Sequence, residues 1–490
     1  MAMATSARTR TPELRKSLQM GHLLALPPEL VQGILSSLPT SDILAASLVN
    51  KRIHQAALTC LYADITITWT LDGPPPMPIM LVLRSILDRP DLGRLVRHLR
   101  LDGKGFDRST DINRTDPMPP PLHTSVVPMR KASSVIQSTK MLAADHWIQG
   151  ISSGVVDAVV ALLMAMMPNL VSLYLGPNFT IRNGHTGAML RSSICQPHQD
   201  QVGAPAFTSL QSVTVTSRTD ELSHRSEDNS LDVLPFLYLP NLEYLSVSID
   251  NSIDFVWPGG YAPRPTRIKC LELYRVRESR LKLILATLND LEKLSWRWFY
   301  YEYLDKHVSK PIIELDVILQ ALQPIQHSLL ELDIGALFVD CEDTIDFSPS
   351  LFTIQSSLDD LSQFHKLQNL SLPWVFVKGL SESSGMNFPT FPASLEQLTL
   401  TNGLFSQEIV EWEDGDIFLA VESWLTVKGS LMTSLRTINP PVPKDWYARD
   451  STNEDNIQAA AKWATALSTK TGHNVTWRKS PDEIDDRGIY

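Results

Sequence analysis

The stretch LVSLYL, from Leu170 to Leu175, sets the architecture of this 490-residue chain. Its first, fourth and sixth residues are apolar, and its second half alternates apolar and polar residues as a half-buried strand does. The same spacing returns along most of the chain. It appears as VRHLRL from Val96, LQSVTV from Leu210, LEYLSV from Leu242, IKCLEL from Ile268, LEKLSW from Leu291, LLELDI from Leu329, LQNLSL from Leu367, LEQLTL from Leu395 and, as a remnant, LRTI from Leu435.

The spacing of these units predicts a solenoid. Successive starts after Leu170 are 40, 32, 26, 23, 38, 38, 28 and 40 residues apart. Leucine-rich repeats are about 20 to 29 residues long, so three spacings fit directly and the longer ones need inserts or longer helices. Segments before several units, such as RLKLILATLND, read as helices. Stacked helix–strand units predict an α/β solenoid with a curved parallel sheet on its concave side. Unrelated strands of another kind of α/β domain are the alternative.

A different pattern precedes the repeats, in LPPELVQGILSSLPTSDILAASLVNKRIHQAA from Leu26. Pro28 suits the first turn of a helix, which should end at Pro39. Thr40 or Ser41 is expected to cap a second short helix, and Asn50 a third. Three such helices are close to the smallest unit that folds alone, so part of their apolar surface must be buried against something else.

These residues resemble the F-box. Both Leu-Pro pairs, the acidic-apolar pair after the first, the Ile-Leu pair and the closing Leu-Val-x-Lys are present. The resemblance implies docking on a Skp-type adaptor, which connects to a cullin-RING scaffold. A local cap that buries these residues against the downstream domain is the alternative. The resemblance assigns the adaptor contact, or its direct support, to Leu26, Pro27, Ile34, Leu35, Leu38, Leu44, Leu48 and Val49.

The repeats resemble the irregular leucine-rich repeats that often follow an F-box. Together the two resemblances imply the substrate receptor of an SCF-type ubiquitin ligase, which would direct a protein substrate to proteasomal degradation. We expect the substrate on the concave face, and tyrosine and arginine are the residue types that most often dominate interfaces. The leading candidates are Tyr244, Tyr274 and Arg297. A leucine-rich-repeat binding scaffold outside any ubiquitin ligase is the alternative function.

Composition excludes several other classes. The formal net charge of -11 disfavours nucleic acid as a partner. The four cysteines lie far apart, without the spacing of a zinc site, which favours a reducing, cytoplasmic or nuclear location. The longest apolar run, from Ala158 to Met167, is shorter than the roughly 20 residues that cross a bilayer, so no membrane association is expected.

The sequence offers no recognisable catalytic machinery. It lacks Walker, GxGxxG, HExxH and GxSxG motifs. His198-x-Asp200 and the acidic run from Asp340 to Asp346 lie in polar stretches and read as loops rather than metal sites. We therefore expect no cofactor and no enzymatic activity, with any role in ubiquitin transfer arising from proximity.

The expected domain organisation follows from these patterns. Residues 1–21 form a disordered tail, 22–66 the F-box and 67–106 a junction with the first repeat. The polar, proline-rich segment 107–150 is expected to be a flexible insertion. Residues 151–440 hold the irregular repeats, and 441–490 a C-terminal cap with one helix and a final strand.

Overall fold

The computed structural model describes residues 26–70, 73–104, 120–141, 143–179, 184–195, 205–216, 233–249, 255–264, 267–301, 310–339, 352–405, 409–442 and 454–477. The expected tail at 1–21, the His198-x-Asp200 motif and the acidic run from Asp340 to Asp346 lie outside these residues.

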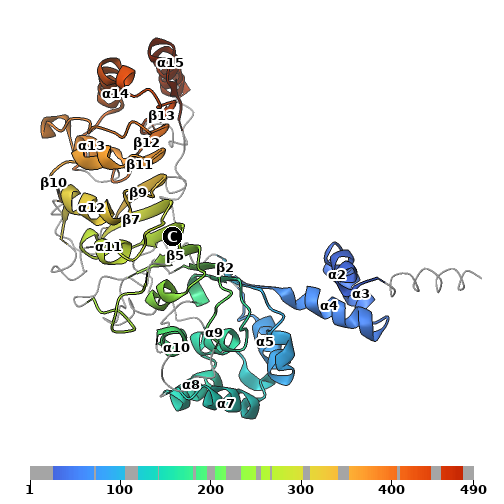
Figure 1. Cartoon of the computed structure of the whole chain (residues 1–490). Coiled ribbons are helices and arrows are strands. Elements are labelled where there is room, and N and C mark those ends of the chain that lie inside the picture. Colours follow the sequence, from blue (N-terminus) through green and yellow to red (C-terminus); the bar gives the residue numbers. More distant parts are fainter. Residues whose placement is uncertain are drawn as a thin grey trace, which may run out of the picture.

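Twelve of the strands in the described residues form one parallel sheet, ordered along the sheet as they are along the chain (Figure 1). Helices α11 (Glu278–Leu285), α12 (Leu315–Leu322) and α13 (Trp374–Lys378) lie along one side of these strands, so the predicted α/β solenoid with a parallel sheet is confirmed. The strands are β1 (Asp64–Thr70), β2 (His98–Lys104), β3 (Ser172–Leu175), β4 (Ser212–Val215), β5 (Tyr244–Ser248), β6 (Cys270–Tyr274), β7 (Lys293–Tyr301), β9 (Glu331–Val339), β11 (Asn369–Pro373), β12 (Gln397–Thr401), β13 (Thr437–Asn439) and β14 (Asn474–Val475).

The apolar positions of the repeated pattern build the core. Leu173 of β3 pairs in register with Leu99 of β2 and with Val213 of β4, and all three side chains are buried. The residues between them, such as Tyr174, point to the opposite face because successive strand side chains alternate. Each fully buried leucine stabilises the fold by about 1.5–3 kcal/mol relative to an exposed one. The packing of these buried side chains against those of the neighbouring strands therefore stabilises the regular part of the solenoid.

Helices cover the convex side of the sheet. Every residue of α9 from Val156 to Met164 is buried, which explains the long apolar run in the sequence, and α12 turns Leu315, Ile318 and Leu322 inward. A second, two-stranded parallel sheet, β8 (Ile312–Glu314) with β10 (Thr353–Gln355), lies beside α12. The main covering helices are α5 (Met77–Asp88), α9 (Val156–Ala165), α11 (Glu278–Leu285), α12 (Leu315–Leu322), α13 (Trp374–Lys378) and α14 (Asp414–Lys428).

The structure corrects the expected flexible insertion at 107–150. Residues 105–119 lie outside the described part, but the chain after them forms α7 (Met129–Ser138) and α8 (Ala144–Ser152). Ile136 and Trp147 are buried in the main core, and Trp147 Nε1 donates to the Ala158 carbonyl at 2.9 Å. The polar, proline-rich composition of this segment predicts flexibility, although a few large apolar residues anchor α7 and α8 in the core.

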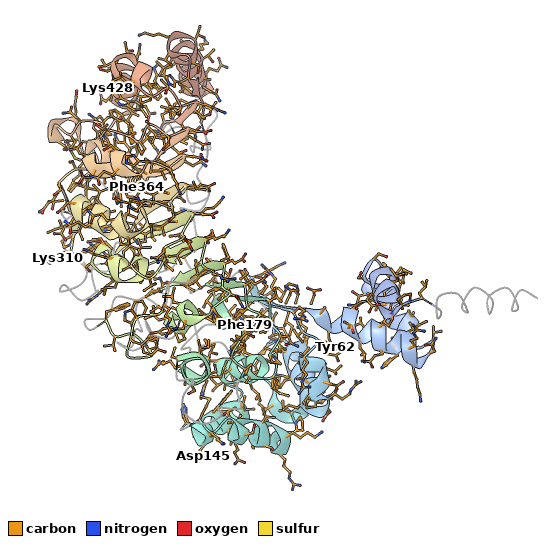
Figure 2. The ribbon with its side chains drawn as sticks, in the orientation of Figure 1. Tyr62, Asp145, Phe179, Lys310, Phe364 and Lys428 are labelled. Atoms are coloured by element: carbon orange, nitrogen blue, oxygen red, sulfur yellow. The ribbon has the colours of Figure 1, made fainter. Side chains whose placement is uncertain are left out.

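The N-terminal helices join the solenoid without a loop. Helix α4 (Lys51–Ala63) runs directly into β1, the first strand of the sheet. Ile53 and Ala57 belong to a small N-terminal cluster, whereas Leu58 on the same helix belongs to the main core. Figure 2 shows Tyr62 where α4 meets the solenoid, and this side chain packs against the main core. One helix thus contributes to both cores.

The far end of the solenoid carries α15 (Glu454–Thr471), which is followed by β14. β14 pairs in parallel with β13, and Phe418 of α14 stacks on Trp463 of α15 with ring centroids 4.4 Å apart. These contacts place a helix and a short strand over the last repeat.

Candidate functional site

The N-terminal helices owe their arrangement to local signals. α2 (Pro28–Ser36) begins at a proline, and both α2 and α3 (Thr40–Ser47) pack on α4. The Asn50 side chain accepts from the backbone amides of Arg52 and Ile53, both at 2.9 Å, and so caps α4 as predicted. The predicted cap of α3 is wrong, because Pro39 precedes its first turn and no side-chain cap bond forms.

A small core holds these helices together. Val31 and Leu35 of α2, Ile43 of α3, and Ile53 and Ala57 of α4 are buried against one another. Arg52 Nη2 also donates to the Leu26 carbonyl at 2.6 Å, which ties the start of α2 to α4. The apolar residues on the inner faces of α2 and α3 are therefore buried against α4.

Their outer faces carry an unusual amount of apolar surface. Fifteen large apolar side chains are exposed in the described residues, and six of them fall within residues 30–49. Their exposed fractions run from 37% for Leu38 to 86% for Leu48. Exposed large apolar side chains that gather in one short segment mark candidate interaction sites. We call these six residues the exposed apolar set: Leu30, Ile34, Leu38, Leu44, Leu48 and Val49.

The predicted adaptor residues divide into two groups. Five belong to the exposed apolar set, and Pro27 is exposed beside it. Leu35 is only 3% exposed and Leu26 is half-buried, so both support the helices from inside. Sequence reasoning missed Leu30 as a surface residue, although its spacing of four from Ile34 places both on one side of α2.

The concave face of the sheet is the second candidate surface. Side chains that alternate with the buried positions form polar rows across consecutive strands; in one row Arg100, Tyr174 and Thr214 are register neighbours. Tyr244 and Tyr274 are half-buried on this face. Burial, followed by the nearby Glu272 carboxylate, raises the pKa of Tyr244 to about 12, so its hydroxyl stays protonated.

Arg297 is placed differently from the two tyrosines. Its Nη2 donates to Asp333 Oδ2 at 2.7 Å, and its side chain is only 10% exposed, against 41% for Asp333. Gly335, its register partner on β9, makes room for it, because a Cβ there would lie 2.5 Å from Arg297 Cδ. The guanidinium is thus engaged within the sheet, and Asp333 is its more accessible partner.

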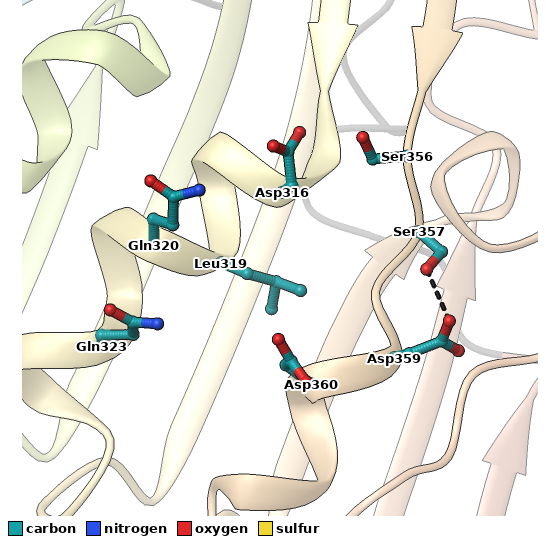
Figure 3. Close-up of a pocket in the computed structure, with 8 residues that line it drawn as sticks. All are labelled: Asp316, Leu319, Gln320, Gln323, Ser356, Ser357, Asp359 and Asp360. Atoms are coloured by element: carbon teal, nitrogen blue, oxygen red, sulfur yellow. Dashed lines mark hydrogen bonds between the residues drawn. The ribbon is translucent and has the colours of Figure 1, made fainter.

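A hollow of about 310 Å³ lies on the convex side, between α12 and the turn after β10 (Figure 3). Ser357 Oγ donates to Asp359 Oδ2 at 2.6 Å across part of its wall. Among the residues described, no group of three or more His, Cys, Asp or Glu side chains is placed to hold a metal ion. The hollow is lined by Asp316, Leu319, Gln320, Gln323, Ser356, Ser357, Asp359 and Asp360.

No single helix in the described part of the chain is both long and apolar enough to cross a bilayer. α8 and α9 together reach the length only as a pair bent by 117°, and α9 is buried in the core.

Comparison with protein families identifies the N-terminal helices. Residues 23–68 match the family described as F-box-like, under a tenth of the chain. No curated protein matches the chain. The molecule is thus an α/β solenoid preceded by an F-box-like domain, and the match supports an F-box protein. F-box domains bind Skp-type adaptors and are generally found in non-catalytic receptors.

Proposed function

We propose that this protein is the substrate-recognition subunit of an SCF-type ubiquitin ligase. In this proposal the exposed apolar set docks on a Skp-type adaptor, which links the chain to a cullin-RING scaffold. The observation that carries the proposal is that an F-box-like domain leaves six large apolar side chains in solvent after its own core is complete. An adaptor surface would remove this apolar area from water.

The solenoid is proposed to bind the protein substrate. Its irregular units are read as leucine-rich repeats, and its concave strands offer an extended polar surface of the kind that such arrays use for binding. Tyr244 and Tyr274 remain proposed contacts. Arg297 would act through Asp333, because its own charge is already paired.

The proposed role in catalysis is proximity. Holding a substrate lysine beside an activated ubiquitin thioester raises its effective concentration without any acid, base or nucleophile from this chain. α4 runs directly into β1, and Leu58 of α4 packs in the main core of the solenoid. This fixed connection between the F-box-like helices and the solenoid supports the proposed role.

The test is a pair of charge substitutions in the exposed apolar set. Leu44→Asp with Leu48→Asp should weaken binding to a purified Skp-type adaptor by about 100-fold or more, because burial of two carboxylates in an apolar interface is costly. Leu419→Asp with Val427→Asp on α14 is the matched control, since both residues are exposed apolar residues far along the chain. Unchanged adaptor binding by the first variant would overturn the proposal.

A further inference from the structure

Arg100 on β2 is held in a fixed orientation on the concave face. Tyr174, its register neighbour on β3, lies beneath it, with Arg100 Cζ 3.9 Å from the centroid of the tyrosine ring. A guanidinium stacked on an aromatic ring keeps its plane fixed while the N–H groups at its edge stay available. Stacking thus removes much of the rotational freedom that an exposed arginine would otherwise lose on binding.

The charge of Arg100 is not consumed by a hydrogen bond to its nearest carboxylate. Asp102 Oδ1 lies 3.8 Å from Arg100 Nη2, beyond hydrogen-bond distance, and the arginine side chain is 49% exposed. By contrast, Arg297 donates to Asp333 at 2.7 Å, and Lys293 donates to Glu331 at 2.8 Å. Arg100 therefore differs from these two cations of the central strands.

The surroundings of Arg100 favour an anion. Thr66 is its register partner on β1 and brings a hydroxyl group beside it, and Thr214 lies one strand further away, beyond Tyr174, on β4. His98 and Lys104 occupy the two ends of the same strand and are exposed. The opposing charges are Asp102 and, 3.9 Å from His98 Nε2, Asp64. An approaching anion would thus find a fixed guanidinium with the exposed Thr66 hydroxyl beside it.

We propose that Arg100, oriented by Tyr174, anchors an acidic side chain of the protein partner bound on the concave face. The anchored group is a carboxylate or a phosphate, which share the two-oxygen geometry that a guanidinium recognises bidentately. The description of this partner as a ubiquitination substrate rests on the proposed function. Direct anion binding by Arg100 does not depend on it.

The test uses three fluorescent peptides with one Gly-Ser backbone that carry glutamate, phosphoserine or glutamine at the same positions. Fluorescence polarisation with the full chain should show binding of the glutamate peptide, the phosphoserine peptide or both, and weaker binding of the glutamine peptide. The stronger of the two acidic peptides identifies the source of the anion. Arg100→Gln should weaken this binding about tenfold or more. Arg100→Lys keeps the charge but not the planar guanidinium that binds two oxygens at once, so it should weaken binding by less.

Lys293→Gln is the matched control, because it removes one exposed positive charge from the same face. Equal losses from Arg100→Gln and Lys293→Gln would overturn the proposal, as would failure of both acidic peptides to bind the folded chain. Binding of a Skp-type adaptor, measured on the same preparation, reports separately on the ligase role. Loss of that binding would contradict the proposed function without touching the assignment of Arg100.

Discussion

At the scale of single residues, Arg277 is a positively charged side chain inside the solenoid core. It is fully buried, and its Nε and Nη2 donate to the two oxygens of Glu278 at 2.9 and 2.8 Å. It also donates to the Lys310 and Ile312 carbonyls, both at 3.1 Å, and stacks over Trp298. One side chain therefore joins the start of α11 to β8 and to Trp298 of β7.

Removing one member of the Arg277–Glu278 ion pair should destabilise the folded chain. Glu278→Leu leaves the Arg277 charge buried without its carboxylate and should lower the free energy of unfolding by about 3–5 kcal/mol. Urea unfolding followed by circular dichroism measures this change. The double variant Arg277→Met with Glu278→Leu should lose less than the single one, and a double variant that loses more would contradict this account of the pair.

The His185 ring stacks on the His146 ring, with ring centroids 4.7 Å apart. Burial, and then the charge of His146, lowers the pKa of His185 from 6.5 to about 4. Between these values the unfolded chain binds more protons than the folded one, so stability should fall as the pH falls from 6.5 to 4. Thermal unfolding across this range should show the loss, and His185→Gln should reduce it. An equally steep dependence in the variant would show that other groups cause it.

At the scale of elements, α4 is the link between the two parts of the molecule, and its start depends on one asparagine. Asn50→Ala removes an acceptor from two backbone amides and should destabilise α4 by about 1 kcal/mol. Hydrogen exchange of the α4 amides reports this change directly. Thr40→Ala in α3 is the control, because no side chain caps that helix and little change is expected. Equal effects of the two substitutions would contradict the assigned caps.

Among the secondary-structure elements, the strands were predicted from the sequence better than the helices and segments between them. The repeated pattern located β2 to β7, β9 and β11 to β13, because buried positions in parallel strands are set by stacking on adjacent repeats. It missed β1 (Asp64–Thr70) altogether, since this strand continues directly from a helix, and it missed α7 and α8. Nor could it show that Arg297 faces Asp333, because that contact depends on which side chains two distant units bring into register.

At the scale of the whole molecule, the two proposed surfaces lie on one continuous framework. A chain that lacks residues 1–66 would lose the N-terminal helices and the first three of the seven residues of β1, including Ile65 of the main core. We expect such a chain to melt at a lower temperature than the full chain, because it lacks part of the main core. Differential scanning calorimetry makes the comparison. Equal melting temperatures of the two chains would contradict the shared core.

The exposed apolar set is proposed to bind a Skp-type adaptor, and titration calorimetry of the full chain with the purified adaptor measures this binding. We expect a one-to-one complex with a dissociation constant at or below about 1 μM, together with a negative heat-capacity change from burial of apolar surface. Absence of binding by the intact, folded chain would contradict the proposed function and would leave a binding scaffold outside any ubiquitin ligase as the better description.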